Sequence, residues 1–119
     1  MRRRIALATL LALAALGTTA ATARAPLAIG IAEREFHISS YRSTVKPGPV
    51  RFYVSNLGQD THNLVVRGPR GFSAATTEIK AGQRATLTAT LRRPGTYMLL
   101  CTRANHARIG MKAKLVVLR

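Results

Sequence analysis

Beyond Arg24, turn-forming residues divide the chain into short segments in which apolar and polar side chains alternate. Turns are predicted at residues 46–49 (KPGP), 67–71 (RGPRG), 81–82 (AG) and 93–95 (RPG), because proline fixes φ and glycine tolerates a positive φ. The segments 50–56 and 84–91 alternate with a period of two, which is typical of half-buried strands. No segment beyond residue 24 has the apolar stripe of a helix. The pattern predicts an all-β protein, an antiparallel sandwich or barrel.

The remaining segments complete the expected strands. Residues 27–37, 62–67, 96–101 and 112–118 are expected to be strands, the first with an irregularity near Glu33. Residues 72–78 are compatible with either a short strand or an irregular crossover. The 119 residues suffice for one domain, and a core between two facing sheets is feasible at this size. Because aromatic residues are few, that core is expected to consist of valine, leucine and alanine.

The first 23 residues have the composition of a secretory signal peptide. Three arginines precede the apolar run IALATLLALAALG, and the small-residue stretch TTAATARA follows it. We expect a signal peptide over residues 1–23, with cleavage near 23–25, and an exported domain over 24–119 in the periplasm or outside the cell. Cleavage after Ala23 is preferred, because cleavage after Ala25 would leave Pro26 at the new terminus. The alternative is an uncleaved membrane anchor, since residues 5–23 are about as long as the minimum for crossing a bilayer.

The chain is strongly basic. Its formal net charge of +15 becomes +12 without Arg2, Arg3 and Arg4. A positive field of this size favours anionic partners, such as acidic redox proteins or an anionic membrane or cell-wall surface. Nucleic acid is not expected as a partner of an exported protein. The alternative interpretation is a solvated basic surface that keeps the protein, expected to be a monomer, in solution.

One cysteine and its neighbours suggest a metal site. Cys101, His106 and Met111 are each separated from the next by four residues, and His62 lies upstream. Exported proteins normally pair their cysteines, so the single thiol is either buried and free or bound to metal. One thiolate, two imidazoles and a weak axial thioether are the ligands of a blue-copper electron-transfer site. The predicted metal ligands are therefore His62, Cys101, His106 and Met111, with one copper ion as cofactor.

Other residues have simpler interpretations. Considered alone, Met111 would be core packing and His62 a hydrogen-bonded histidine. His37 has no matching partner and is interpreted as a structural or surface residue. Tyr97 is expected in the core or in a tyrosine corner. No catalytic residues are predicted, since the sequence has no Gly-x-Ser-x-Gly elbow.

Three stretches together carry a family resemblance. They are VKPGPVRFYVSNLGQDTHNLVV (45–66), IKAGQRATLTATLRRPGTYMLLC (79–101) and CTRANHARIGMKAKLVV (101–117). The chain resembles the cupredoxins, the small blue-copper proteins of the plastocyanin/azurin type, and the spacing after Cys101 matches the azurin-like loop. The resemblance implies an eight-stranded Greek-key sandwich with copper at one end. It also implies equatorial ligands at His62, Cys101 and His106 and an axial ligand at Met111.

The resemblance extends to the neighbours of the ligands. Asn63 matches a family asparagine whose side chain ties the two ligand loops together, and Thr102 follows the cysteine as in many relatives. Ala104 and Asn105 stand where the family commonly has Pro-Gly, so a positive φ is expected at Asn105.

The surroundings of His106 differ from the family pattern. Many cupredoxins have an apolar docking patch around this histidine, whereas here Arg103 and Arg108 flank it. We therefore expect partner docking to depend more on electrostatic attraction than it does in those relatives.

The resulting hypothesis is an exported type 1 copper protein, not an enzyme, that carries single electrons between redox partners with acidic docking surfaces. The alternative hypothesis is a copper carrier or homeostasis protein without redox turnover. A third hypothesis is a metal-free interaction domain. The single cysteine excludes a binuclear two-cysteine copper centre. The absence of His-x-His pairs argues against a multicopper oxidase.

Overall fold

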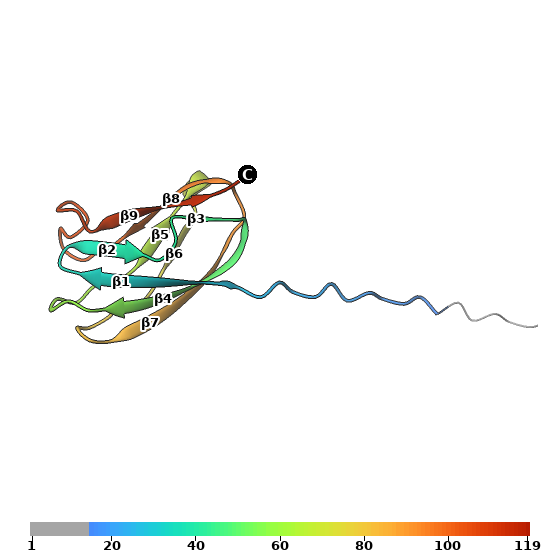
Figure 1. Cartoon of the computed structure of the whole chain (residues 1–119), viewed down its shortest axis with the longest axis horizontal. Coiled ribbons are helices and arrows are strands. Elements are labelled where there is room, and N and C mark those ends of the chain that lie inside the picture. The colour runs from blue at the N-terminus through green and yellow to red at the C-terminus, as the bar shows by residue number, and fades with distance from the viewer. Residues whose placement is uncertain (1–14) are drawn as a thin grey trace, which may run out of the picture.

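The computed structural model describes residues 15–119 (Figure 1). The first 14 residues of the expected signal peptide lie outside the described residues. Residues 15–26 are exposed and contain no strand, and within the described part of the chain the buried side chains all lie between Ile29 and Val117. The described domain therefore has a core to which residues 15–26 contribute no buried side chain. Within residues 15–119, no helix has the length and hydropathy needed to cross a membrane.

Nine strands in the described part of the chain form two sheets, which confirms the predicted all-β sandwich. The first sheet has the order β2 (His37–Ser40), β1 (Leu27–Arg34), β4 (Gly48–Asn56), β7 (Arg84–Leu91). The second has the order β3 (Thr44–Val45), β9 (Lys112–Val117), β8 (Gly95–Leu100), β5 (Val65–Arg67), β6 (Ser73–Ala75). A short 3₁₀ turn, η1 (Pro69–Gly71), connects β5 to β6.

The pairing differs from the expected purely antiparallel arrangement at two places. β1 pairs in parallel with β4, and β3 pairs in parallel with β9. Both parallel pairings arise because the chain crosses from the first sheet at β2 to the second at β3, and then returns to the first at β4. The strand alternation in the sequence predicts strands but contains no information about this crossing.

The core lies between the two sheets. Side chains at every second position of β1 and β4 face those of β8 and β9. The buried apolar residues of these four strands are Ile29, Ile31, Val50, Phe52, Val54, Tyr97, Leu99, Leu115 and Val117. Isoleucine thus contributes beside the valine and leucine that were predicted, and the alanines of β7 are only partly buried.

Tyr97 forms the tyrosine corner. Its ring is buried, and its hydroxyl donates a hydrogen bond to the carbonyl of Arg93 at 2.9 Å. Gly68 packs against the ring so closely that a Cβ at this position would overlap it. This glycine therefore permits the close approach of the β5–η1 turn to Tyr97.

Several expected strands differ in extent from the observed ones. The first expected strand is divided into β1 and β2 by a turn at Glu35 and Phe36. The strand expected from residue 62 begins only at Val65, because the N–H and carbonyl of His62 form an isolated bridge with Ile79. The ambiguous segment 72–78 contains β6.

The two ends of the sandwich carry different parts of the sequence. We call one the site end: there β1, β4 and β8 finish and β9 begins. It is the left end in Figure 1. At the opposite end lie the turns after β3, β5 and β7, and there the chain enters the domain from residues 15–26 (Figure 1). The predicted ligands all belong to the site end.

Candidate metal centre

Three of the four predicted ligands converge in a buried cluster. The Nδ1 atoms of His62 and His106 lie 3.3 Å apart, and the Sγ of Cys101 lies 3.9 Å and 3.6 Å from them, respectively. His62 and Cys101 are fully buried, and His106 is 8% exposed. Two nitrogen donors and one sulfur donor therefore face a common point.

The loop after β8 brings two of these residues and Met111 together. The backbone N–H of Cys101 donates to the carbonyl of Met111 at 3.2 Å, and the N–H of Met111 donates to the carbonyl of His106 at 3.0 Å. These bonds close the loop at its base. Met111 is fully buried in the same core cluster as Cys101. Its role as axial ligand remains a prediction.

Asn63 and Thr102 join the two segments that carry the ligands. The Asn63 side-chain amide donates to the Thr102 hydroxyl at 2.8 Å, and the Thr102 backbone N–H donates to Asn63 Oδ1 at 2.8 Å. The predicted contact between the two loops is therefore present. Because each residue directly follows a predicted ligand, the pair holds His62 and Cys101 in register.

The backbone of the ligand loop differs from the expectation at one residue. Ala104, with φ +43°, has the left-handed conformation that was expected at Asn105. The N–H of His106 donates to the carbonyl of Arg103 at 3.0 Å, so Ala104 lies inside the tight turn that this bond closes. The turn therefore places the positive φ at Ala104, one residue before Asn105. This conformation costs some free energy at alanine, because its Cβ is crowded there.

Glu35 is a contact of His62 that the sequence did not indicate. Its Oε1 lies 3.1 Å from Nε2 of His62 and accepts the backbone N–H groups of Gln59 and Asp60, each at 2.7 Å. Gly58 leaves room for this carboxylate, which a Cβ there would overlap. The hydrogen bond from the Asp60 N–H is the largest cause that lowers the pKa of Glu35. The Gln59 N–H and His62 also lower this pKa, whereas desolvation raises it.

The two imidazoles share an orientation. Each turns Nδ1 toward the thiol, while Nε2 faces a carboxylate, with Asp60 Oδ2 3.8 Å from Nε2 of His106. The ring of Phe36 packs on His106 with 4.9 Å between centroids. Carboxylates that bind the outer nitrogen of a ligating histidine fix its tautomer and its ring orientation. The outer contact is a direct hydrogen bond only at His62.

A second acidic side chain lies inside the sandwich. Glu33 in β1 is fully buried, and neither of its carboxyl oxygens has a hydrogen-bond partner within residues 15–119. Burial raises the pKa of this carboxyl to about 8. The sequence indicated only an irregularity here, because an acidic residue in a strand is normally placed in solvent.

The chemistry of the donors fits copper. Burial raises the pKa of the Cys101 thiol, so a metal ion that binds the thiolate must displace its proton. Two imidazoles with one thiolate, and a buried thioether in the same loop, suit an ion that alternates between Cu(I) and Cu(II). The residues are therefore placed for one copper ion.

Comparisons with known proteins agree with this chemistry. The family described as "Copper binding proteins, plastocyanin/azurin family" matches residues 26–118. A crystal structure of dithionite-reduced auracyanin from the photosynthetic bacterium Roseiflexus castenholzii is 26% identical with a TM-score of 0.70. The match covers 81% of this chain and all of that one. No curated protein sequence matches the chain.

Two further structures share the fold. Auracyanin B is 20% identical with a TM-score of 0.67, over 87% of this chain and 97% of that one. A multicopper oxidase is 15% identical with a TM-score of 0.62, and the match spans 79% of this chain but only 45% of the oxidase. The family match extends over nearly all of the described domain, including all four predicted ligands. The chain belongs to the plastocyanin/azurin family of copper-binding proteins.

Proposed function

We propose that this protein is an exported type 1 copper protein that carries single electrons between redox partner proteins. The observation that supports the proposal is the convergence of two Nδ1 atoms and one Sγ within 3.9 Å of one another in a buried cluster. Copper held by such a set accepts and releases one electron as it alternates between Cu(II) and Cu(I). The ligands are His62, Cys101 and His106, with Met111 as the axial one.

The surrounding contacts keep the donors in one geometry. The Asn63–Thr102 pair joins the ligand segments, and Glu35 holds the outer nitrogen of His62. A site that is already organised for the metal changes little between two oxidation states, which favours electron transfer. His106 is the only one of the four ligands with exposed surface, so electrons enter and leave through its ring.

The surface around His106 supports docking of a partner with acidic groups. Arg108 is exposed beside Ile109, which is 49% exposed, whereas Arg103 is paired with Glu78. The partner therefore meets an apolar side chain and a free arginine next to the histidine. Association should slow as salt is added, since screening weakens the attraction between opposite charges.

An optical spectrum of the copper-loaded protein tests the site. We expect an intense thiolate-to-Cu(II) charge-transfer band in the visible that is absent in Cys101→Ser. The matched control is Ser55→Ala, a partly buried β4 hydroxyl outside the ligand set, which should keep the band. A colourless Cu(II) complex of the unaltered protein would contradict the type 1 assignment.

Metal release separates electron transfer from copper delivery. The buried donors favour retention of copper in both oxidation states. An electron carrier should stay loaded with copper through repeated cycles of reduction and oxidation in the presence of a Cu(I) chelator. Rapid loss of copper to the chelator after reduction would favour the carrier or homeostasis function instead.

We also propose export, with residues 1–23 acting as a signal peptide. The apolar run and small-residue stretch in the sequence support this, as does the core between Ile29 and Val117, to which residues 15–26 contribute no buried side chain. The N-terminal sequence of the protein recovered outside the cytoplasm should begin near residue 24. A product that retains the apolar segment would indicate the membrane-anchored alternative.

A further inference from the structure

The acidic residues of the chain all lie at the site end. The four are Glu33, Glu35, Asp60 and Glu78. Glu33 is buried in β1, Glu35 and Asp60 lie beside the histidines, and Glu78 is paired with Arg103 of the ligand loop. The domain is therefore electrically polarised along its length, although its net charge is strongly positive.

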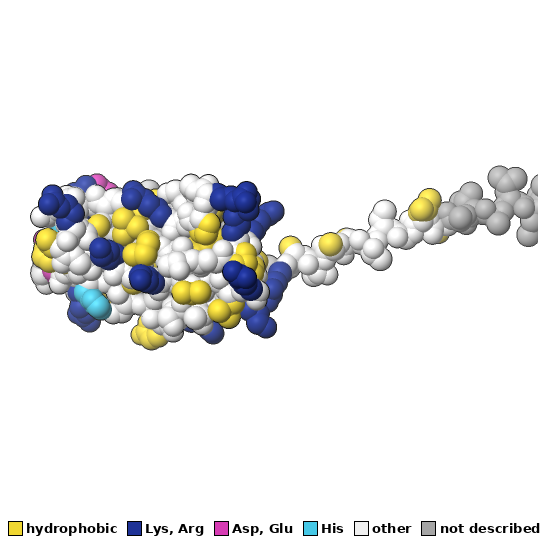
Figure 2. Space-filling view, turned by 90° about the horizontal axis from the view of Figure 1, so that it is seen from above, with side chains coloured by type: hydrophobic (Ala, Val, Ile, Leu, Met, Phe, Trp, Pro, Cys, Tyr) yellow, Lys and Arg dark blue, Asp and Glu magenta, His cyan; other side chains and the backbone are white. Residues whose placement is uncertain are grey.

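The opposite end is basic. We call it the basic end; its exposed cations are Arg24, Arg42, Lys46, Arg70, Arg92, Arg93 and Arg119. Figure 2 shows lysine and arginine side chains gathered around this end, where residues 15–24 leave the domain. On the face shown, Asp and Glu side chains are visible only at the other end. None of these seven cations takes part in an ion pair within residues 15–119. Their charge is free to act on a partner.

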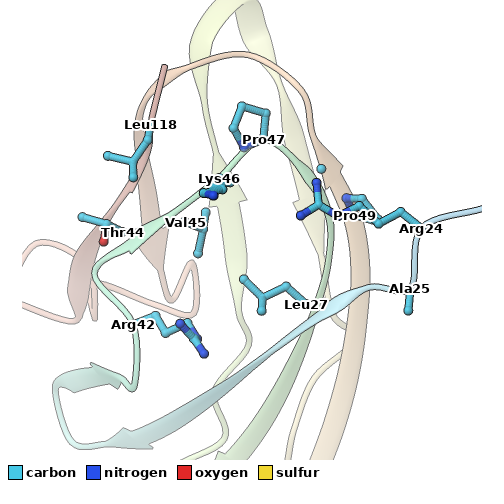
Figure 3. Close-up of a pocket in the computed structure, with 11 residues that line it drawn as sticks. Arg24, Ala25, Leu27, Arg42, Thr44, Val45, Lys46, Pro47, Pro49 and Leu118 are labelled. Carbon is cyan, nitrogen blue, oxygen red and sulfur yellow. The ribbon is translucent and has the colours of Figure 1, made fainter.

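Three of the basic side chains surround one pocket. Arg24, Arg42 and Lys46 line it together with apolar residues that include Leu27 and Leu118 (Figure 3). The other cations lie on separate turns, with Arg92 and Arg93 between β7 and β8 and Arg70 in η1. The positive charge is thus spread over the whole end of the sandwich and is mixed with exposed apolar groups such as Leu118, which is 43% exposed.

We propose that the basic end docks onto the anionic headgroups of a lipid bilayer. A broad basic surface with interspersed apolar side chains suits a negatively charged plane, to which each cation near the surface adds attraction. The spread of these cations over separate turns around the whole end supports an extended anionic plane over a single acidic protein site. Docking in this orientation points the site end away from the membrane, where His106 remains open to a redox partner. The proposal does not depend on bound copper.

Vesicle binding by the domain over residues 24–119, which holds all the buried side chains of the described part of the chain, tests the proposal without the apolar segment. Vesicles containing phosphatidylglycerol in phosphatidylcholine should bind the protein, and pure phosphatidylcholine should not. The triple variant Lys46→Gln, Arg92→Gln, Arg93→Gln should bind at least roughly tenfold more weakly, since each cation contributes separately. The matched control Arg34→Gln, Lys80→Gln, Arg84→Gln removes the same charge from exposed positions at the site end and should lose much less affinity.

A tryptophan probe tests the orientation directly, because the chain contains no tryptophan. Leu118→Trp places the probe at the basic end, and Ile109→Trp places it in the ligand loop at the site end. Both positions are similarly exposed, at 43% and 49%. Anionic vesicles should shift the emission of the first variant to shorter wavelength and leave that of the second unchanged.

Three results would overturn the proposal. The first is absence of binding to the anionic vesicles at low salt. The second is equal loss of affinity in the two triple variants, which would show that only net charge matters. The third is binding of polyglutamate through the basic end without binding of vesicles, which would assign this surface to an acidic protein.

Discussion

Oε1 of Glu35 lies 3.1 Å from Nε2 of His62, and the same oxygen accepts two backbone N–H groups from the loop that precedes this histidine. Backbone N–H groups of the β4–β5 loop thus hold the carboxylate in the position from which it contacts the imidazole. Because Nδ1 of His62 faces Cys101, the contact at Nε2 determines which nitrogen remains for the metal.

Replacement of Glu35 should weaken copper binding. Glu35→Ala removes the acceptor at Nε2, and loss of such a contact costs roughly 10–100-fold in metal affinity. Glu35→Gln keeps an oxygen acceptor and should lose less affinity, but it should raise the reduction potential because a nearby negative charge favours Cu(II). Competition titration and voltammetry measure these quantities. Glu78→Ala, which removes an exposed carboxylate, is the control, and equal affinities for Glu35→Ala and the unaltered protein would refute the role of Glu35.

The Asn63–Thr102 pair should contribute measurably to stability. Each hydrogen bond is worth about 0.5–1.5 kcal/mol net, and Asn63→Ala removes both of them, whereas Thr102→Ala removes one. In the Asn63→Ala background, Thr102→Ala should cost almost nothing further. A double-mutant cycle by urea denaturation of the metal-free protein gives the coupling energy. Strictly additive effects would show that the two side chains do not act as a unit.

Glu33 should make the stability of the metal-free protein fall as pH rises. The carboxyl has a pKa of about 8 in the folded protein and an ordinary value near 4.5, so the folded state holds the proton more tightly. Its contribution is fully present below pH 4.5 and is lost progressively as pH approaches 8. The slope is about 1.4 kcal/mol per pH unit, or about 3 kcal/mol between pH 5 and pH 7.

Glu33→Gln tests this linkage because the amide does not titrate. Denaturation midpoints measured from pH 5 to pH 8 should decline less steeply in the variant than in the unaltered protein. The variant should also be the more stable of the two near pH 8. Glu78→Gln, an exposed carboxylate, serves as the comparison and should leave the decline unchanged. Parallel curves for Glu33→Gln and the unaltered protein would contradict the prediction.

The tyrosine corner provides a test of the fold alone. Tyr97→Phe deletes the hydroxyl that donates to Arg93 and should lower the free energy of unfolding by about 1 kcal/mol. Tyr53→Phe makes the same chemical change on an exposed side chain and should have no comparable effect. Thermal denaturation of the two variants measures the difference. An unchanged free energy of unfolding in Tyr97→Phe would show that the hydrogen bond adds nothing to stability.

Local patterns predicted the strands well and their arrangement less well. The alternation over 84–91 corresponds to β7 over the same residues, because a half-buried strand needs only a period of two. The parallel pairing of β1 with β4 depends instead on a crossing between sheets that no local pattern records. Similarly, the sequence indicated positive φ at Asn105, whereas the closed turn places it at Ala104.

The sequence by itself determined the chemical types of the metal donors, the succession of short strands and the excess of positive charge. Only the tertiary structure decided that Glu35 meets His62 across 27 residues, that Glu33 is buried, and that all four acids lie at the site end. The reason is physical: the types of side chain are local properties, whereas their proximity depends on which strand ends meet when two sheets close on one core. The same closure leaves the opposite end of the sandwich with cations and no acidic side chain.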